Sequence, residues 1–369
     1  MYADIKGDGL PLQKNKVTTG DIIEILKKMM IKDQNSSFMM RAAHTKSLGL
    51  VKGYFTICPD LPKNLRIGLF RESKRYPAFI RFSNSNPKFT SDKLKDIRGV
   101  AIKLIDDTQT NFSQDFILAS CPTLPFGTLN EFNEVLYWGL KNPFYLFLNT
   151  LFQGKLTKFI QVYKMTKHDT SPLDIKYWSI TPYAFGNYAV KYLLRPTSTY
   201  HSTLPKDLTD AYLSTNMQRH LLTNDATFDF CIQLQKDKTK MPIDDVSIQW
   251  SETESKPIKI AEIRILAQNF NTKERAYFSE ILTYSPANSL IEHKPLGAIN
   301  QARVEIYNEL SASRCAKNQI PKLIPTENNF TSKKSDSCLY SNKKVKLLPM
   351  QCMNQQAFYF ICTKIHSNN

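Results

Sequence analysis

Two groups of strand-like segments, separated by one long helical stretch, place the strongest limit on how this chain can fold. The segments are rich in β-branched and aromatic residues, and short polar turns separate them. They cover residues 51–58, 77–84, 97–106 and 115–120 before the helical stretch, and 188–196, 227–235 and 258–266 after it. The stretch itself, residues 129–164, is rich in aromatic residues. This arrangement favours an antiparallel barrel or sandwich with added helices.

Both ends of the chain differ from this central region. Near the start, apolar residues recur at helical spacing in 17–32, which predicts an amphipathic helix. After the last helical segment the sequence contains "SKKSD" and "SNKKVK" and few regular patterns. We therefore expect an N-terminal arm with a helix (1–36), one large domain (37–318) and an irregular basic tail (319–369).

Composition restricts the cellular setting. The chain is 42% hydrophobic and 22% charged, as in globular proteins. It contains no run of 18 or more apolar residues, so we do not expect a membrane-spanning helix. It begins "MYADIKGDGLP", without the basic and apolar regions of a secretory signal. Its seven cysteines are scattered and form no CxxC pair. Together these features predict a cytoplasmic protein with reduced thiols.

The net charge of +16 raises the question of an anionic partner. Nucleic acid, a membrane surface and an anionic lipid would all suit this charge. No nucleic-acid-binding motif accompanies the basic residues, so we do not expect a nucleic-acid partner. The basic tail and the helical residues 144–164 are candidates for contact with a membrane surface or an anionic lipid. The ordinary alternative is a solvated charged face over a core helix.

One predicted helix, residues 299–318, carries an unusual stripe. Arg303, Tyr307 and Arg314 are spaced i, i+4 and i+11, so they fall within about 40° of one another around the helix. The simplest explanation is an aromatic residue at the helix–core boundary with two solvated arginines. The functional alternative is a phenolate held by cationic neighbours, which can serve as the axial ligand of a ferric haem.

A second set of candidates lies earlier in the chain. His44 follows Arg41 by three residues, and Arg81 lies in a strand-like segment. Each is by itself an ordinary structural or surface residue. Together the two arginines could bind carboxylates, including the propionates of a haem. The six histidines have no metal-ligand spacing, so we do not expect a zinc or di-iron site.

These segments resemble the haem catalase family, and most closely its shorter catalase-like members. The matching motifs occur in the family's order, at about its distances, over about 40–315. They are "RAAHTKSLGLVKGYFTI" (41–57), "YPAFIRFSN" (76–84), "KDIRGVAIKLID" (95–106), "SPAN" (285–288), "PLGAIN" (295–300) and "RVEIYNELSASR" (303–314). The resemblance implies an α+β fold, in which an antiparallel β-barrel has flanking and inserted helices, and it implies haem b as the cofactor.

On the proximal side, the resemblance implies that Tyr307 ligates the haem iron and that Arg303 holds its phenolate. Arg314 would lie near a propionate or the proximal network.

On the distal side, it implies that His44 is the acid–base residue that moves a proton between the two peroxide oxygens. Ser83 would accept a hydrogen bond from His44 and orient it. Arg41 and Arg81 would bind the propionates.

The resemblance departs from the family at "LASCPTLPF" (118–126). Ser120 stands where the family has a distal asparagine, and serine is shorter and has a single hydroxyl. Leu124 and Pro125 occupy the place of an aromatic residue, with Phe126 one position later. With these residues at the distal positions, the resemblance does not by itself imply fast disproportionation of hydrogen peroxide. It also does not extend to the additional C-terminal portion of large catalases, so it implies neither their tetramer nor their nucleotide site.

We expect a haem-dependent oxidoreductase that cleaves the O–O bond of hydrogen peroxide or an organic hydroperoxide. One alternative is an enzyme that rearranges a fatty-acid hydroperoxide, as the allene oxide synthases of this fold do. Another is a haem-binding protein without turnover. The sequence leaves the oligomeric state open.

Overall fold

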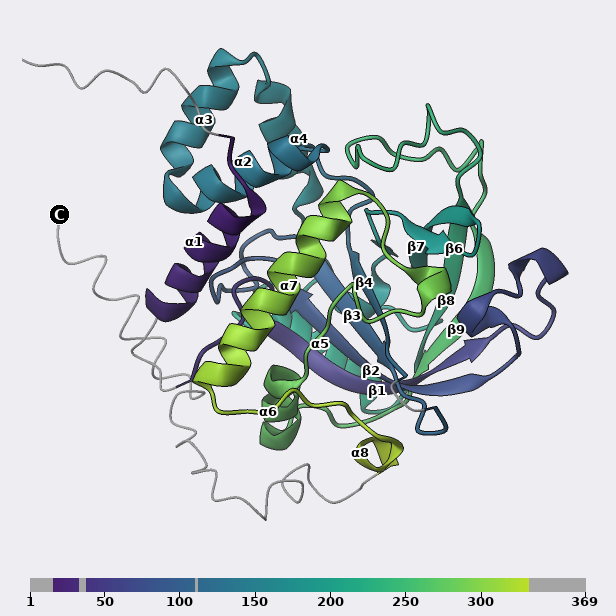
Figure 1. Ribbon diagram of the computed structural model, residues 1–369. Coiled ribbons are helices and arrows are strands. Elements are labelled where there is room, and N and C mark those ends of the chain that lie inside the picture. Colours follow the sequence, from purple (N-terminus) through teal and green to yellow (C-terminus); the bar gives the residue numbers. More distant parts are fainter. Residues whose placement is uncertain (1–15, 33–37, 110–111, 332–369) are drawn as a thin grey trace, which may run out of the picture.

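Eight antiparallel strands close into a barrel in the computed structural model, which describes residues 16–32, 38–109 and 112–331 (Figure 1). With β6, which pairs with β7 and is not part of the ring, the sheet has nine strands: β1 (Ser47–Ile57), β2 (Arg75–Asn84), β3 (Arg98–Leu104), β4 (Gln114–Ala119), β5 (Tyr177–Trp178), β6 (Tyr183–Phe185), β7 (Tyr188–Pro196), β8 (Ala226–Leu234) and β9 (Ile258–Ile265). Their order is β5-β4-β3-β2-β1-β9-β8-β7-β6, and pairing of β5 with β7 closes the ring. The predicted α+β fold with an antiparallel barrel is confirmed.

Aromatic side chains fill the inside of the barrel. Phe116 of β4 lies between Phe230 and Tyr192, with ring centroids 4.7 and 5.0 Å away, and Phe55 lies 5.0 Å from Phe230. All four side chains are buried. Inward-facing residues of a barrel of this size are expected to pack as a core, and this one does.

The outer face of β2, β3 and β4 carries polar and small residues in register. Two neighbouring rows cross these strands: Ser83, Gly99 and Ala119 in one, and Arg81, Ala101 and Ile117 in the other. Because side chains two residues apart in a strand point to the same face, both rows lie on one surface. The strand register therefore brings Arg81 and Ser83 to one wall of the barrel.

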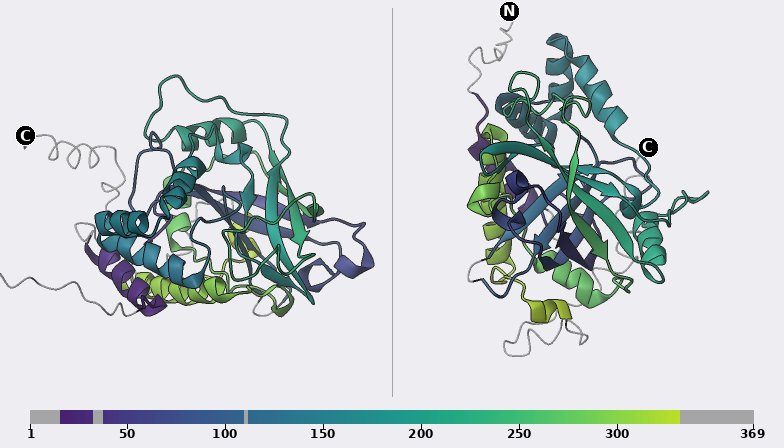
Figure 2. Two further views of the ribbon diagram at one scale, coloured as in Figure 1. Left: turned by 90° about the horizontal axis from the view of Figure 1, so that it is seen from above. Right: turned by 90° about the vertical axis from the view of Figure 1, so that its right-hand side faces the viewer.

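Helices cover the barrel wall. They are α1 (Thr19–Lys32), α2 (Leu129–Lys141), α3 (Pro143–Phe152), α4 (Leu156–Met165), α5 (Tyr212–Leu221), α6 (Lys273–Ile281), α7 (Ala298–Lys317) and α8 (Glu327–Thr331). Helices α1, α2 and α7 pack together through Ile22, Leu26, Leu136 and Ile306. Figures 1 and 2 show α7 lying across the barrel, with α1 and α2 beside it and α3 and α4 further out.

The predicted helical stretch 129–164 consists of three helices. Helix α2 ends at Asn142, whose N–H donates to the carbonyl of Trp138 and whose side chain accepts from the N–H of Tyr145. Pro143 starts α3, because proline lacks the N–H that a continuous helix would need but fits a first helical turn. Gly154, with φ of 67°, lies between α3 and α4.

All seven predicted strands are present with ends that shift by a few residues, and so are the predicted N-terminal and C-terminal helices. Strands β5 and β6, of two and three residues, were not predicted because they are too short to show a period. Helices α5 and α6 were also missed.

The segment predicted as a tail begins on the barrel. Phe330 of α8 is buried against Phe79 and Tyr54, with ring centroids at 6.0 and 5.1 Å. The rest of that segment, 332–369, and residues 1–15 and 33–37 of the predicted arm lie outside the described residues. Within the described part of the chain, no helix is both long and apolar enough to cross a membrane.

Candidate functional site

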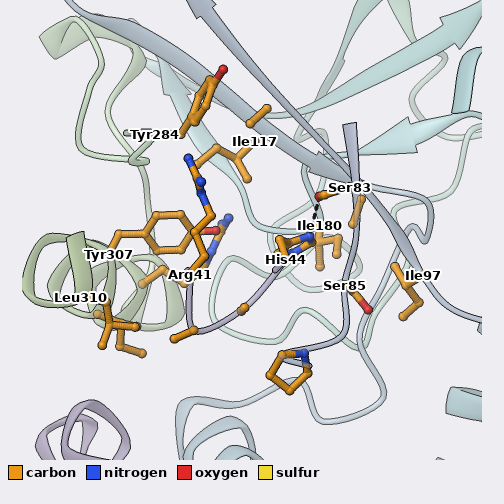
Figure 3. A pocket seen from close by; sticks show the side chains of 18 of the residues that line it. Arg41, His44, Ser83, Ser85, Ile97, Ile117, Ile180, Tyr284, Tyr307 and Leu310 are labelled. Atoms are coloured by element: carbon orange, nitrogen blue, oxygen red, sulfur yellow. Dashed lines mark hydrogen bonds between the residues drawn. The ribbon is translucent and has the colours of Figure 1, made fainter. Parts of the chain in front are cut away.

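A cavity of about 500 Å³ lies against the outer wall formed by β2, β3 and β4 (Figure 3). Helix α7 bounds it on the opposite side, and α1 and α2 contribute Met30 and Leu136. Most of its lining side chains are apolar. The cavity brings together seven of the eight predicted site residues: Arg41, His44, Ser83, Arg81, Arg303, Tyr307 and Arg314.

Tyr307 projects from α7 with its hydroxyl directed toward the side of the cavity where His44 lies (Figure 3). Arg303 precedes it by one helical turn, and the guanidinium carbon lies 5.9 Å from the centre of the Tyr307 ring. Its Nη1 donates to Thr181 Oγ1 at 2.7 Å and to Asn300 Oδ1 at 2.9 Å. These two acceptors fix the guanidinium beside the phenol.

The electrostatics around Arg303 favour its charged form. Burial lowers the pKa of Arg303, but the neighbouring Tyr183 and Tyr307 hydroxyls outweigh burial and raise it above the usual value. Arg303 therefore keeps its positive charge next to the Tyr307 oxygen.

His44 lies in the loop before β1 and faces the cavity from the barrel wall. Its Nδ1 is 3.0 Å from Ser83 Oγ, as predicted for this pair. His44 has a φ of 54°, an unfavourable value for a residue with a side chain. Arg81 Nη2 donates to the His44 carbonyl at 2.9 Å and helps to hold this conformation.

The pKa of His44 is lowered to about 4, mainly by burial and further by the positive charge of Arg81. The imidazole is therefore neutral at neutral pH. When Nδ1 donates to Ser83, Nε2 is left as a proton acceptor.

Three arginines converge on the C-terminal end of α6. Arg41 Nη1 donates to the Glu280 carboxylate at 2.9 Å, and its Nη2 donates to the Ser279 carbonyl at 2.9 Å. Arg81 Nη2 lies 3.5 Å from the other Glu280 carboxylate oxygen. Arg314 donates to the Glu280 backbone carbonyl. We call these four residues, Arg41, Arg81, Arg314 and Glu280, the arginine cluster.

The arginine cluster carries an excess of positive charge. Burial would raise the pKa of Glu280, but Arg41, Arg81 and Arg314 lower it below the ordinary value, so the carboxyl is ionised. The pKa of Arg81 and that of Arg314 fall to about 10, mainly through burial, which still leaves both protonated at neutral pH. Three guanidiniums and one carboxylate leave two positive charges at the edge of the cavity.

Ser120, the eighth predicted site residue, does not line this cavity. Its Oγ accepts a hydrogen bond from the N–H of Arg98 at 2.9 Å, and its own N–H donates to the Arg98 carbonyl. Ser120 instead borders a separate cleft with Asp169 and Trp178. The structure therefore places Ser120 outside the cavity that holds His44, with its hydroxyl bonded to the backbone at the start of β3.

The aromatic residue expected near this stretch is also placed differently. Leu124 lines the cavity, whereas Phe126 is buried against Phe159 of α4, with ring centroids 6.1 Å apart. The phenylalanine that lines the cavity is Phe132 from α2.

Sequence reasoning missed Glu280 and the close approach of Gly99. The only signal for Glu280 is a carboxylate inside the apolar run "YFSEIL" (277–282). A carboxylate in such a position needs a cationic partner when it is buried. Gly99 lies within the predicted strand-like segment 97–106, and nothing in that pattern shows that a Cβ on it would lie 2.6 Å from the His44 ring.

No protein-family model and no curated protein matches this sequence. Among solved structures, the chain is similar to a fungal catalase with a TM-score of 0.61 and 16% identity, over 90% of this chain and 73% of that chain. It is also similar to a bacterial catalase with a TM-score of 0.58 and 14% identity, over 85% of this chain and 64% of that chain. At these identities the likeness shows a catalase-like fold alone. Any proposal about the reaction must rest on the residues of the site.

Proposed function

We propose that this chain is a haem b-dependent oxidoreductase that acts on hydrogen peroxide or organic hydroperoxides. The observation that carries the proposal is the pairing of Tyr307 with Arg303 on one side of an apolar cavity and neutral His44 with Ser83 on the other. The catalase-like fold is consistent with it.

The residues fit a haem in three respects. The cavity is largely apolar, as the faces of a porphyrin require. The two surplus positive charges of the arginine cluster match the two propionates. Tyr307 offers an anionic oxygen ligand of a kind that ferric haem accepts, and Arg303 supports its ionised form.

Bound haem would supply a redox-active iron that provides the electrons for breaking the peroxide bond, and a second peroxide molecule or an organic donor would return them. The protein residues would supply the proton transfer. Nε2 of His44 takes the proton from one peroxide oxygen and delivers it to the other, which leaves as water or an alcohol. Ser83 keeps the imidazole in the required orientation, and the low pKa of His44 keeps it available as a base.

A second candidate is the rearrangement of a fatty-acid hydroperoxide within the same site. Two observations favour it. The end of the cavity between α1, α2 and α7 is lined by the apolar side chains of Met30, Leu136, Leu140 and Leu310, which suit an acyl chain. Ser120 contributes no polar group to hold a second hydrogen peroxide.

Haem titration of the purified chain tests the proposal first. The wild type should give a saturable one-to-one ferric spectrum, and Tyr307→Phe should lose it or bind haem far more weakly. Tyr284→Phe is the matched control, because Tyr284 is another phenol on the cavity wall and lies outside the proposed ligand set. Identical binding by the wild type and Tyr307→Phe would refute the assignment.

Three assays of the haem-loaded protein then separate the reactions. Oxygen evolution from hydrogen peroxide indicates catalase activity, and oxidation of an added donor without oxygen indicates peroxidase activity. Loss of the diene absorbance of a lipid hydroperoxide without a donor indicates rearrangement. A haem-loaded protein that is inert in all three assays would be a haem-binding protein, contrary to the proposal.

For the location of this activity we propose the cytoplasm. The four described cysteines, Cys58, Cys121, Cys231 and Cys315, are all free, which suits a reducing compartment. Cell fractionation with antibodies against the full chain would test this.

A further inference from the structure

Helices α3 and α4 gather exposed apolar side chains. Among the described residues, 16 large hydrophobic side chains are exposed, and seven of them lie between residues 144 and 163. They are Phe144, Phe147, Leu151, Phe152, Leu156, Ile160 and Tyr163, and we call them the apolar patch. Single exposed hydrophobic residues are ordinary, but a contiguous group of this kind usually marks an interaction surface.

The exposed face of α3 is apolar in addition to its packed face. Phe144, Phe147 and Leu151 follow one another at i, i+3 and i+7, so they lie on one side of the helix. Leu146 and Thr150 lie on the opposite side and are buried. A helix at the edge of a folded domain normally exposes polar residues to water, so the exposed apolar face of α3 is unusual.

Helix α4 lies beside α3, with the rings of Phe147 and Phe159 5.9 Å apart, and it also exposes apolar side chains. Leu156, Ile160 and Tyr163 are spaced i, i+4 and i+7 and are exposed, with Tyr163 at 68%. Figures 1 and 2 show α3 and α4 standing out from the barrel on the side away from its strands.

Lysines outnumber carboxylates around the apolar patch. From residue 135 to residue 168 the chain has five lysines and no aspartate or glutamate. Lys155 and Lys158 form ion pairs with Glu131, at 3.2 and 2.6 Å. The other three, Lys141, Lys164 and Lys167, form no ion pair with any described residue. A partner that covers the apolar patch must therefore tolerate or attract positive charge.

We propose that α3 and α4 dock this protein on the surface of an anionic phospholipid bilayer. The apolar side chains would enter the boundary between headgroups and acyl chains, while the lysines contact phosphate and carboxylate groups. Trp138 and Tyr145, whose rings lie 4.3 Å apart at the junction of α2 and α3, suit the headgroup level.

Charge argues against two other occupants. A second copy of this chain, packed through the same face, would bring the two sets of lysines together, which is unfavourable. The second alternative occupant is the chain's own segment 332–369. It contains six lysines and one aspartate, so its net charge is positive like that of the lysines around the apolar patch. Docking on a bilayer does not depend on the proposed peroxide chemistry and can be measured without it.

The test is co-sedimentation of the full chain with vesicles. One set of vesicles is pure phosphatidylcholine, and the other contains about one third phosphatidylserine, which imitates an anionic leaflet. We expect binding to the anionic vesicles that weakens as salt is raised. No binding to them, or equal binding to both sets, would overturn the proposal.

Two paired substitutions separate the apolar and ionic contributions. Phe147→Ser with Phe152→Ser should lower partitioning at least about tenfold, because two rings no longer enter the bilayer. Lys164→Glu with Lys167→Glu should abolish the preference for anionic vesicles. The control is Leu222→Ser with Ile324→Ser, which removes two equally exposed side chains outside the apolar patch and should leave binding unchanged.

Circular dichroism of each variant establishes that it folds as the wild type does. Light scattering tests the alternative of self-association. If the wild type is a dimer that the phenylalanine variant dissociates, and vesicles are not bound, the apolar patch is an interface between two copies and the proposal is wrong.

Discussion

Gly99 on β3 lies directly against the imidazole of His44. A Cβ at position 99 would stand 2.6 Å from both Cε1 and Nδ1 of the ring, and 3.1 Å from Ser83 Oγ. Atoms cannot approach this closely, so any side chain at position 99 must displace the histidine. The φ of Gly99 lies outside the left-handed region, so the backbone conformation does not require glycine here. The contact with His44 does.

Gly99→Ala should therefore impair the distal side of the site alone. Haem binding through Tyr307 should persist, while turnover of peroxide should fall at least about tenfold, because the imidazole loses its position. Haem titration and peroxide assays on the same preparation measure both effects. Gly139→Ala in α2 is the control, since a Cβ there meets its nearest neighbour at 3.6 Å. Unchanged turnover in Gly99→Ala would remove His44 from the proposed mechanism.

The arginine cluster predicts a strong effect of Glu280→Gln. This change leaves three guanidiniums close together without their buried counter-charge, so the free energy of unfolding should fall by about 3–5 kcal/mol. Haem should restore part of the loss, because its propionates would supply two negative charges. Urea unfolding with and without haem measures this.

Glu131→Gln is the matched control for Glu280→Gln. It also removes a carboxylate from a group of cations, Lys155 and Lys158, but these are partly exposed. Its cost should stay within about 1 kcal/mol. Equal losses in the two variants would mean that the arginine cluster has no special role.

The strands and the stripe of Arg303, Tyr307 and Arg314 on α7 could be predicted from local patterns, whereas the pairing of His44 with Ser83 was implied only by the family resemblance. Residue type and spacing carry that information, because a strand alternates every two residues and a helix repeats every 3.6. The barrel's closure through β5 could not be predicted, since a two-residue strand has no period.

Ser120 and Glu280 show where prediction from local pattern ends. Ser120 occupies the matching place in the sequence, but its hydroxyl is bound to the backbone of Arg98. Glu280 meets arginines that lie 239 and 34 residues away in the chain. Both outcomes depend on contacts distant in sequence, which the barrel register decides.

Two buried histidines predict how stability depends on pH. Burial lowers the pKa of His44 and that of His293 from 6.5 to about 4. His293 Nε2 accepts a hydrogen bond from the N–H of Leu69, which also requires the neutral ring. Between pH 6.5 and 4 the unfolded chain therefore binds more protons than the folded chain, so the free energy of unfolding falls as pH falls.

Each histidine should contribute a slope of up to about 1.4 kcal/mol per pH unit in that range. Urea unfolding of the haem-free chain at several pH values measures the slope. His44→Gln should reduce it by about one histidine's share. If the wild type and His44→Gln gave parallel curves between pH 6.5 and 4, His44 would not be neutral in the folded state.

Because Ser120 lies outside the cavity that holds His44, we predict that an amide side chain at position 120 will not produce catalase activity. In Ser120→Asn the new side chain would start from a residue that borders the cleft beside Asp169 and Trp178, outside the cavity that holds His44. The variant also loses the hydroxyl that accepts from the Arg98 N–H, at a cost of about 1 kcal/mol. Oxygen evolution from hydrogen peroxide should therefore stay at the wild-type level or fall, with slightly lower stability. A clear rise in oxygen evolution would mean that residue 120 reaches the peroxide after all, and the proposed distal site would then have to include it.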